Sequence, residues 1–340
     1  MLKDFLPKKI CDCLYLRITD EDINEIRFRL NCPITIKCNL KTYFLSDNGL
    51  CGSPSTALYT TKEMLEDIVF KASEFSMYSV SEQLKQGFIT VDGGVRLGVC
   101  GEVAPEGNEI KAIKNITSIC VRVPHEIKGI SKSVFNQIVN DDKVLNTLVI
   151  SPPGAGKTTL LRDLVYQISY HNYPYNVFIA DERGELVGGS KLPFNLGYFY
   201  DCLSFVKKSK SMLLGLRSMS PDIVVTDEIG ENDDCDAILK LMTCGVSVIA
   251  SVHADSIEDL RKKPALLELI DGKYFDRFIV LSKRDGVGTI EGVYRGDFSK
   301  IYGGTIWKPF YLLVLLHFLQ ALDLVWLVVT MSAKDFSLIC

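Results

Sequence analysis

At its most informative point the chain reads Leu148-Val149-Ile150-Ser151-Pro152-Pro153-Gly154-Ala155-Gly156-Lys157-Thr158-Thr159. An apolar strand runs into a loop rich in glycine and proline, and the pattern predicts a helix from Leu160 onward. Glycines let backbone N–H groups approach an anionic ligand closely, and a helix N-terminus adds the positive end of its dipole. Lys157 would reach the β- and γ-phosphates, and the Thr158 hydroxyl would bind Mg²⁺. The sequence therefore predicts a nucleoside triphosphate site in the loop formed by Ser151, Pro152, Pro153, Gly154, Ala155, Gly156, Lys157, Thr158 and Thr159.

The composition is that of an ordinary globular protein. The chain has 340 residues, enough for two or three domains, with 24% charged and 47% hydrophobic residues. A formal net charge of −4 argues against broad electrostatic capture of nucleic acid, so no nucleic-acid partner is expected. The eleven cysteines form no CxxC pair and the N-terminus shows no secretory signal. These features indicate reduced thiols in the cytoplasm and no structural zinc.

Residues 1–145 are predicted to form a smaller α+β domain. Apolar residues at helical spacing predict an amphipathic helix over residues 18–30. Strands are predicted over 34–38, 87–91, 95–100 and 117–123, with a hairpin turn at Asp92-Gly93-Gly94. Arg96 and Arg122 fall on these strands, either as functional residues or as solvated charges.

Residues 146–302 are predicted to form an α/β domain. Five nearly continuous apolar runs alternate with helical segments, over 148–150, 177–180, 223–226, 246–252 and 278–281. This pattern predicts a mostly parallel sheet that helices cover on both faces. Such sheets bind ligands at the carboxyl ends of their strands, which is where the phosphate-binding loop falls.

Residues 303–340 differ from both regions. An apolar run from 310 to 331 is long enough to span a bilayer, but it contains His317, Gln320 and Asp323. Their spacing of three puts these polar residues on one stripe of a helix, and an Asp near the membrane centre costs about 2.5–3.5 kcal/mol. Three interpretations stay open: a membrane helix packed against a partner, a buried amphipathic helix, and a foreign or frame-shifted end.

Two acids after the third apolar run would complete a hydrolytic site. Hydrolysis of a nucleoside triphosphate needs a carboxylate that holds Mg²⁺ through water and a base that orients the attacking water. Asp227 stands where the strand stops and would be the Mg²⁺ ligand, and the adjacent Glu228 would polarise the water. The alternative is an acidic strand end facing solvent, which the phosphate-binding loop upstream makes a weaker explanation.

Three further candidates lie at neighbouring strand ends. Glu182 follows the second apolar run together with Asp181, and either acid could join the Mg²⁺ and water network; a structural pair with Arg183 explains Glu182 equally well. His253 ends the fourth run, where it would sense the γ-phosphate or serve a structural role. Arg217, before the third run, could reach the nucleotide of the same or a neighbouring subunit, or be a surface charge at a helix end.

In this order the motifs resemble those of the hexameric ATPases of type II and type IV secretion: phosphate loop, acidic box, Asp-Glu strand end and histidine box. The chain is still more similar to the stage III sporulation protein AA family of endospore-forming bacteria. That likeness runs from about residue 15 to about residue 295, and Ser151 in place of the usual glycine is compatible with it. The segments that carry it are 26–29, 86–90, 95–101, 151–164, 181–183, 218–222 and 226–230.

The resemblance implies a RecA-like core that binds ATP and Mg²⁺ and works as a homo-oligomeric ring, a hexamer. It implies an ATPase at the cytoplasmic base of a channel between mother cell and forespore, peripheral to the membrane. The partners would be membrane-embedded proteins of a secretion-like complex, and ATP hydrolysis would energise assembly or transport.

Two other functions stay open. A nucleic-acid-stimulated translocase uses the same core, but the net charge and the lack of a stripe of basic and aromatic residues argue against it. An ATP-gated scaffold would bind ATP and scarcely hydrolyse it. Phe199 and Glu231 favour the scaffold, because they stand where the resemblance leads us to expect arginine.

Overall fold

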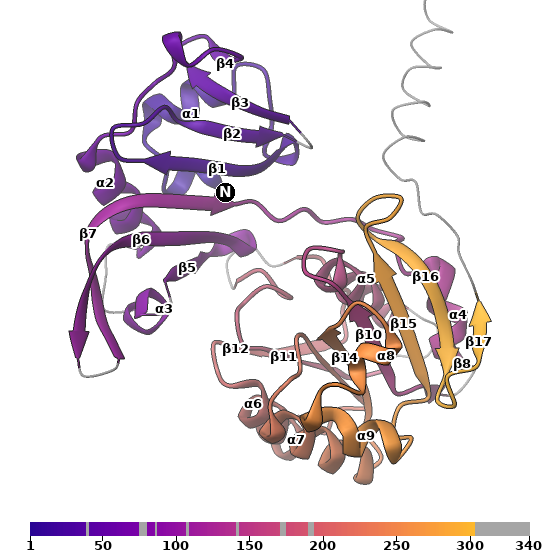
Figure 1. Ribbon diagram of the computed structural model, residues 1–340. Helices are drawn as coiled ribbons and strands as arrows, with labels where there is room; N and C mark the ends of the chain where they lie inside the picture. Colours follow the sequence, from indigo (N-terminus) through magenta and orange to yellow (C-terminus); the bar gives the residue numbers. More distant parts are fainter. Residues whose placement is uncertain are drawn as a thin grey trace, which may run out of the picture.

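In the computed structural model the chain forms two large β-sheets, each with its own helices (Figure 1). The structure describes residues 1–38, 41–74, 80–85, 87–106, 109–140, 143–170, 175–189 and 194–302. The predicted tail over 303–340 lies outside these residues. Within the described ranges, no helix is both long and apolar enough to cross a membrane. The domain boundaries expected at 145 and 302 stay predictions.

The first sheet has seven antiparallel strands in the order β4-β3-β2-β1-β7-β6-β5. Its strands are β1 (Ile23–Arg29), β2 (Thr35–Cys38), β3 (Lys41–Ser46), β4 (Gly49–Cys51), β5 (Phe88–Val91), β6 (Val95–Glu106) and β7 (Glu109–Arg122). The helices beside it are α1 (Lys8–Leu14), α2 (Lys62–Ala72) and α3 (Ser81–Lys85). Phe28 and Ile36 of the sheet and Leu65 of α2 share one core. The predicted hairpin is present, since Val91 of β5 pairs with Val95 of β6.

The helix predicted over residues 18–30 is wrong, because most of this segment is strand β1. Ile23, Ile26 and Phe28 are all buried. The pairing of β1 with β2 shifts register between Ile23 and Glu25, so one extra residue is accommodated there. This irregularity brings Ile23 and Ile26, three residues apart, to the same face of the sheet. A bulged strand thereby acquires the apolar spacing of a helix.

The second sheet has eight strands in the order β12-β11-β13-β14-β10-β15-β16-β17. They are β10 (Thr147–Ser151), β11 (Val177–Asp181), β12 (Tyr200–Ser204), β13 (Ile223–Thr226), β14 (Ser247–His253), β15 (Arg277–Ser282), β16 (Thr289–Arg295) and β17 (Lys300–Tyr302). In this order the first six strands, β12, β11, β13, β14, β10 and β15, run parallel to one another. Strands β16 and β17 add an antiparallel edge. The five predicted strands are β10, β11, β13, β14 and β15, so the predicted α/β class with a mostly parallel sheet is confirmed.

Helices cover both faces of the second sheet (Figure 1). On β10, Val149 packs in one core with Leu160 of α5 (Lys157–Ser169), whereas Leu148 and Ile150 belong to a second core with Ile238 of α7 (Asn232–Thr243). Burial on both faces explains why these strands are apolar without alternation. The hairpin β8 (Val139–Asn140) and β9 (Lys143–Val144) precedes β10. The helices are α4 (Lys132–Ile138), α5 (Lys157–Ser169), α6 (Lys208–Ser218), α7 (Asn232–Thr243), α8 (Ile257–Leu260) and α9 (Leu267–Asp271).

The first sheet contacts the second at the loop that follows β11. Arg96 of β6 places its Nη1 2.7 Å from Oε1 of Glu185 in that loop. Thr90 of β5 donates its hydroxyl to the carbonyl oxygen of Arg183 at 3.1 Å. Arg96 therefore has a partner in the loop after β11, whereas Arg122 lies 3.9 Å from Glu25 of its own sheet.

Candidate functional site

The loop that is predicted to bind phosphate lies between β10 and α5. Gly154 and Gly156 have φ angles of 67° and 97°, left-handed values that a residue with a Cβ rarely adopts. Gly156 is the N-cap of α5, so the helix begins at Lys157. Only 5% of the Lys157 side chain is exposed. Backbone N–H groups of the loop, the start of a helix and a buried cation thus come together in one place, which suits a phosphate group.

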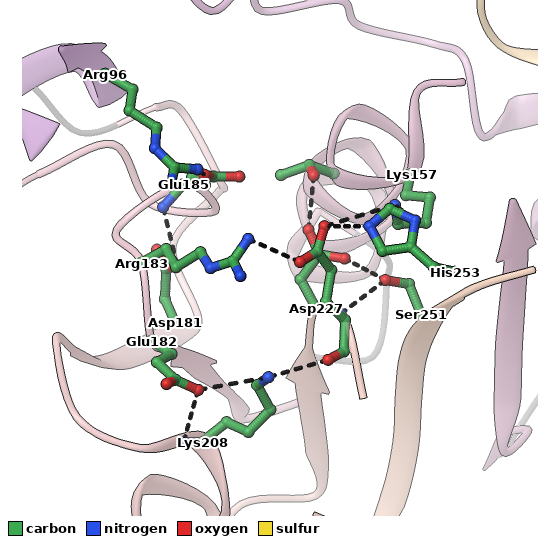
Figure 2. Close-up of polar contacts among 12 residues, drawn as sticks. Arg96, Lys157, Asp181, Glu182, Arg183, Glu185, Lys208, Asp227, Ser251 and His253 are labelled. Carbon is green, nitrogen blue, oxygen red and sulfur yellow. Dashed lines mark hydrogen bonds and ion pairs between the residues drawn. The ribbon is translucent and has the colours of Figure 1, made fainter. Parts of the chain in front are cut away.

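The parallel strands bring the predicted chemical groups to the same edge of the sheet (Figure 2). Ser151 at the end of β10 lies opposite His253 at the end of β14. Asp227 directly follows β13, the next strand. The Thr158 hydroxyl donates a hydrogen bond to Oδ2 of Asp227 at 2.6 Å. Thr158 and Asp227 are 69 residues apart in the sequence, so the hydrogen bond shows that the loop and the end of the third apolar run lie in direct contact.

Glu228 is the centre of an ion cluster. One carboxylate oxygen accepts from Nη1 of Arg183 at 2.8 Å, and the other lies 2.8 Å from Nε2 of His253 and 3.7 Å from Nζ of Lys157. Burial raises the pKa of the Glu228 carboxyl, but the neighbouring Arg183, His253 and Lys157 outweigh it, so the pKa lies below its ordinary value. Glu228 also has a φ of 55°, a strained conformation for a residue other than glycine. The fold holds an ionised carboxylate in this position at a conformational cost.

Ser251 of β14 is a site residue that the sequence did not reveal. Its hydroxyl donates to Oδ1 of Asp227 and accepts the backbone N–H of Glu228 at 3.0 Å. It is fully buried, so its hydroxyl meets these two partners away from bulk solvent. The available signal was a hydroxyl side chain in an otherwise apolar run, two residues before His253.

The two acids after β11 have different surroundings. Asp181 is buried and accepts three backbone N–H groups of its own loop, from residues 185 to 187. Burial raises its pKa to about 6 in spite of these donors. Asp181 therefore uses its carboxylate to shape the loop, and it lines one small pocket together with Asp227 and Glu228. Glu182 lies 3.4 Å from Nζ of Lys208, which in turn donates to the carbonyl oxygen of Glu228 at 3.0 Å (Figure 2).

Arg217 is not brought to the site within this chain. It belongs to the last turn of α6, whose first residue is Lys208. Arg217 comes nine positions after Lys208, about 13.5 Å along the helix at 1.5 Å per residue. Arg217 is exposed there, so a role toward a neighbouring subunit stays a prediction.

The residues present fit a magnesium ion bound together with a nucleotide. Among the described residues, no three His, Cys, Asp or Glu side chains gather as a metal-binding group. Mg²⁺ in nucleotide sites needs only one or two protein ligands, because phosphates and water complete its shell. The Thr158 hydroxyl and the Asp227 carboxylate, already 2.6 Å apart, supply this minimal set.

Comparison with known proteins identifies relatives along most of the chain. A family model described as "Sporulation stage III, protein AA" matches residues 4–301. The chain is 36% identical to Stage III sporulation protein AA of Bacillus subtilis (strain 168) over 281 residues, which cover 81% of this chain and 88% of that protein.

Solved structures of secretion and pilus ATPases share the fold. The pilus retraction motor PilT with bound ADP matches with a TM-score of 0.54 at 12% identity, over 77% of this chain and 74% of that one. The ATPase DotB of Yersinia pseudotuberculosis matches with a TM-score of 0.52 at 14% identity, over 78% and 73% of the two chains. At such identities the likeness concerns the fold alone, and it confirms the predicted RecA-like core.

Proposed function

Since the chain belongs to the sporulation stage III protein AA family, we propose that it is a Mg²⁺-dependent ATP hydrolase. In this proposal the protein works as a homo-oligomeric ring, a hexamer, on the cytoplasmic side of the mother-cell membrane. There it energises assembly of, or transport through, a channel complex between mother cell and forespore. The partners are membrane-embedded proteins of that complex.

The observation that carries the proposal is the meeting of Thr158 with Asp227 immediately beside Glu228. Lys157 and the backbone N–H groups of the loop bind the phosphates, and Thr158 and Asp227 hold Mg²⁺. The ion neutralises charge on the β- and γ-phosphates when it is bound. All these groups lie at the carboxyl edge of one parallel sheet, where ligands of such folds bind.

Glu228 acts in this scheme as the base for water. As the water oxygen bonds to the γ-phosphorus, its proton passes to the Glu228 carboxylate, and the bond from the γ-phosphorus to the bridging oxygen breaks. The products are ADP and inorganic phosphate. Arg183 is about half exposed, so its guanidinium can turn from Glu228 toward the γ-phosphate. The lowered pKa keeps Glu228 ionised, so its carboxylate can accept a hydrogen bond from the attacking water and orient it.

The test is ATP turnover with Mg²⁺ as a function of protein concentration, for the unchanged chain and for Lys157→Ala and Glu228→Gln. Asp236→Asn is the matched control, because it removes an exposed carboxylate from α7. Turnover that rises with concentration and disappears only in the two site variants supports a hydrolase completed by oligomerisation. If the chain binds ATP without turnover, and Glu228→Gln changes neither property, the proposal is refuted and the ATP-gated scaffold becomes the better explanation.

A further inference from the structure

The loop over residues 283–288, between β15 and β16, lies against the phosphate-binding loop. The N–H of Gly288 donates to the carbonyl oxygen of Ala155 at 3.0 Å. A Cβ built on Gly156 would lie 3.4 Å from Cγ1 of Val287, so the two loops are in close contact. A Cβ built on Gly154 would lie 3.2 Å from Nζ of Lys283. The ammonium group of Lys283 thus lies beside the turn that would bind phosphate.

Lys283 differs from its neighbour in how its charge is used. Arg284 lies 3.4 Å from Asp285 and 3.2 Å from Glu291, so its charge is balanced inside the protein. The side chain of Lys283 is exposed and has no hydrogen bond or ion pair with any residue that the structure describes, whereas its backbone carbonyl accepts from the N–H of Gly286. An unpaired cation a few ångströms from a phosphate-binding turn is available to an anionic ligand.

The strand order decides which part of the ligand Lys283 meets. β10, which carries the phosphate-binding loop, lies between β14 and β15. His253 ends β14, and Asp227 and Glu228 follow β13, the next strand on that side. The cleaved γ-phosphate belongs on the side of these three residues. Lys283 follows β15 and therefore lies on the opposite side of the loop, toward the phosphates that remain in ADP.

We propose that Lys283 is a further nucleotide-binding residue, which contacts the α- and β-phosphates rather than the transferred γ-phosphate. This inference rests on the proposed function, because it assumes that the loop binds ATP. It adds a nucleotide-binding residue that lies more than 100 residues after the phosphate-binding loop in the sequence. The pairing of β15 with β10 brings this residue next to the loop. Since both nucleotides carry these phosphates, Lys283 should strengthen the binding of ADP and ATP alike.

The experiment measures equilibrium binding of ADP and of ATPγS to the full chain by calorimetry, together with kcat and KM for ATP. Lys283→Ala should weaken both nucleotides about tenfold, which corresponds to about 1.4 kcal/mol, and should raise KM more than it lowers kcat. Lys283→Arg should restore most of the affinity. Arg284→Ala is the matched control, since it removes a paired cation from the same loop and should leave both dissociation constants unchanged within twofold. Thermal unfolding of each variant checks that the fold is kept.

The outcomes separate the inference from the proposed function. If the unchanged chain binds both nucleotides and Lys283→Ala binds them equally well, the assignment of Lys283 is refuted and the proposed function stands. If Lys283→Ala weakens ATPγS but not ADP, Lys283 contacts the γ-phosphate and the assignment is also refuted. If the unchanged chain binds neither nucleotide, the proposed function fails, and the assignment fails with it.

Discussion

Replacement of Ser251 by alanine isolates the contribution of a buried hydroxyl to the proposed hydrolytic site. The Ser251 hydroxyl donates to Asp227 and accepts the backbone N–H of Glu228, and the side chain is fully buried. A hydrogen bond to a charged group contributes about 1.5–3 kcal/mol. If that energy holds Asp227 and Glu228 in their reactive positions, kcat for ATP should fall about 10- to 100-fold in Ser251→Ala. Binding of ADP in the absence of Mg²⁺ should change less than twofold, because neither carboxylate then contacts the ligand.

Ser247→Ala is the matched control for this prediction. Ser247 lies on the same strand and is also buried, but its hydroxyl donates to the carbonyl oxygen of Val144 at 2.7 Å, away from the site. Its loss should lower the free energy of unfolding by about 1 kcal/mol and leave kcat intact. Steady-state turnover and urea unfolding of both variants are the measurements. Equal kcat values for the two variants would refute the positioning role of Ser251.

Three further predictions concern the surroundings of the site. Arg183→Ala should move the acid limb of the pH–turnover profile to higher pH, because the charge of Arg183 helps hold the pKa of Glu228 below its ordinary value; an unmoved limb would contradict this. For Asp181, with a pKa of about 6 in the fold and 3.8 ordinarily, the contribution to stability is full below pH 3.8 and is lost as the pH rises through 6. Urea unfolding should therefore show the unchanged chain gaining about 1 kcal/mol relative to Asp181→Asn between pH 7 and pH 5, and a pH-independent difference would argue against it. Gly156→Ala should lower the free energy of unfolding by about 1–3 kcal/mol, since its φ of 97° excludes a Cβ, and thermal unfolding with and without ADP tests this.

The parts of the site that sequence predicts are those whose position follows from the chain locally. Lys157, Asp227 and His253 each end or follow an apolar run, and parallel strands bring such ends to one edge of a sheet. Ser251 is different, because nothing in an apolar run marks one hydroxyl as facing a carboxylate. Local sequence patterns do not predict the position of Lys283 either, because only the pairing of β15 with β10 brings it to the phosphate-binding loop.

Elsewhere a prediction from sequence fails because the same spacing of residues is compatible with two different local structures. The irregular register of β1 gives Ile23 and Ile26 the spacing of a helix, although both lie on a strand. Acidic residues at a strand end are equally ambiguous: Asp181 and Glu182 are adjacent, yet one is a buried acceptor for its own loop and the other contacts Lys208. Only tertiary packing separates such pairs.

The left-handed backbone conformation of Glu228 lowers the stability of the fold at a residue that is proposed to be needed for activity. A residue with a Cβ at a φ of 55° costs roughly 1 kcal/mol or more, and glycine would relieve that cost. Glycine there would also remove the carboxylate that pairs with the buried Lys157, so the relief of backbone strain is set against the loss of an ion pair and of the group that is proposed to perform the chemistry. Variants of Glu228 that are selected for a higher melting temperature must therefore also be screened for turnover.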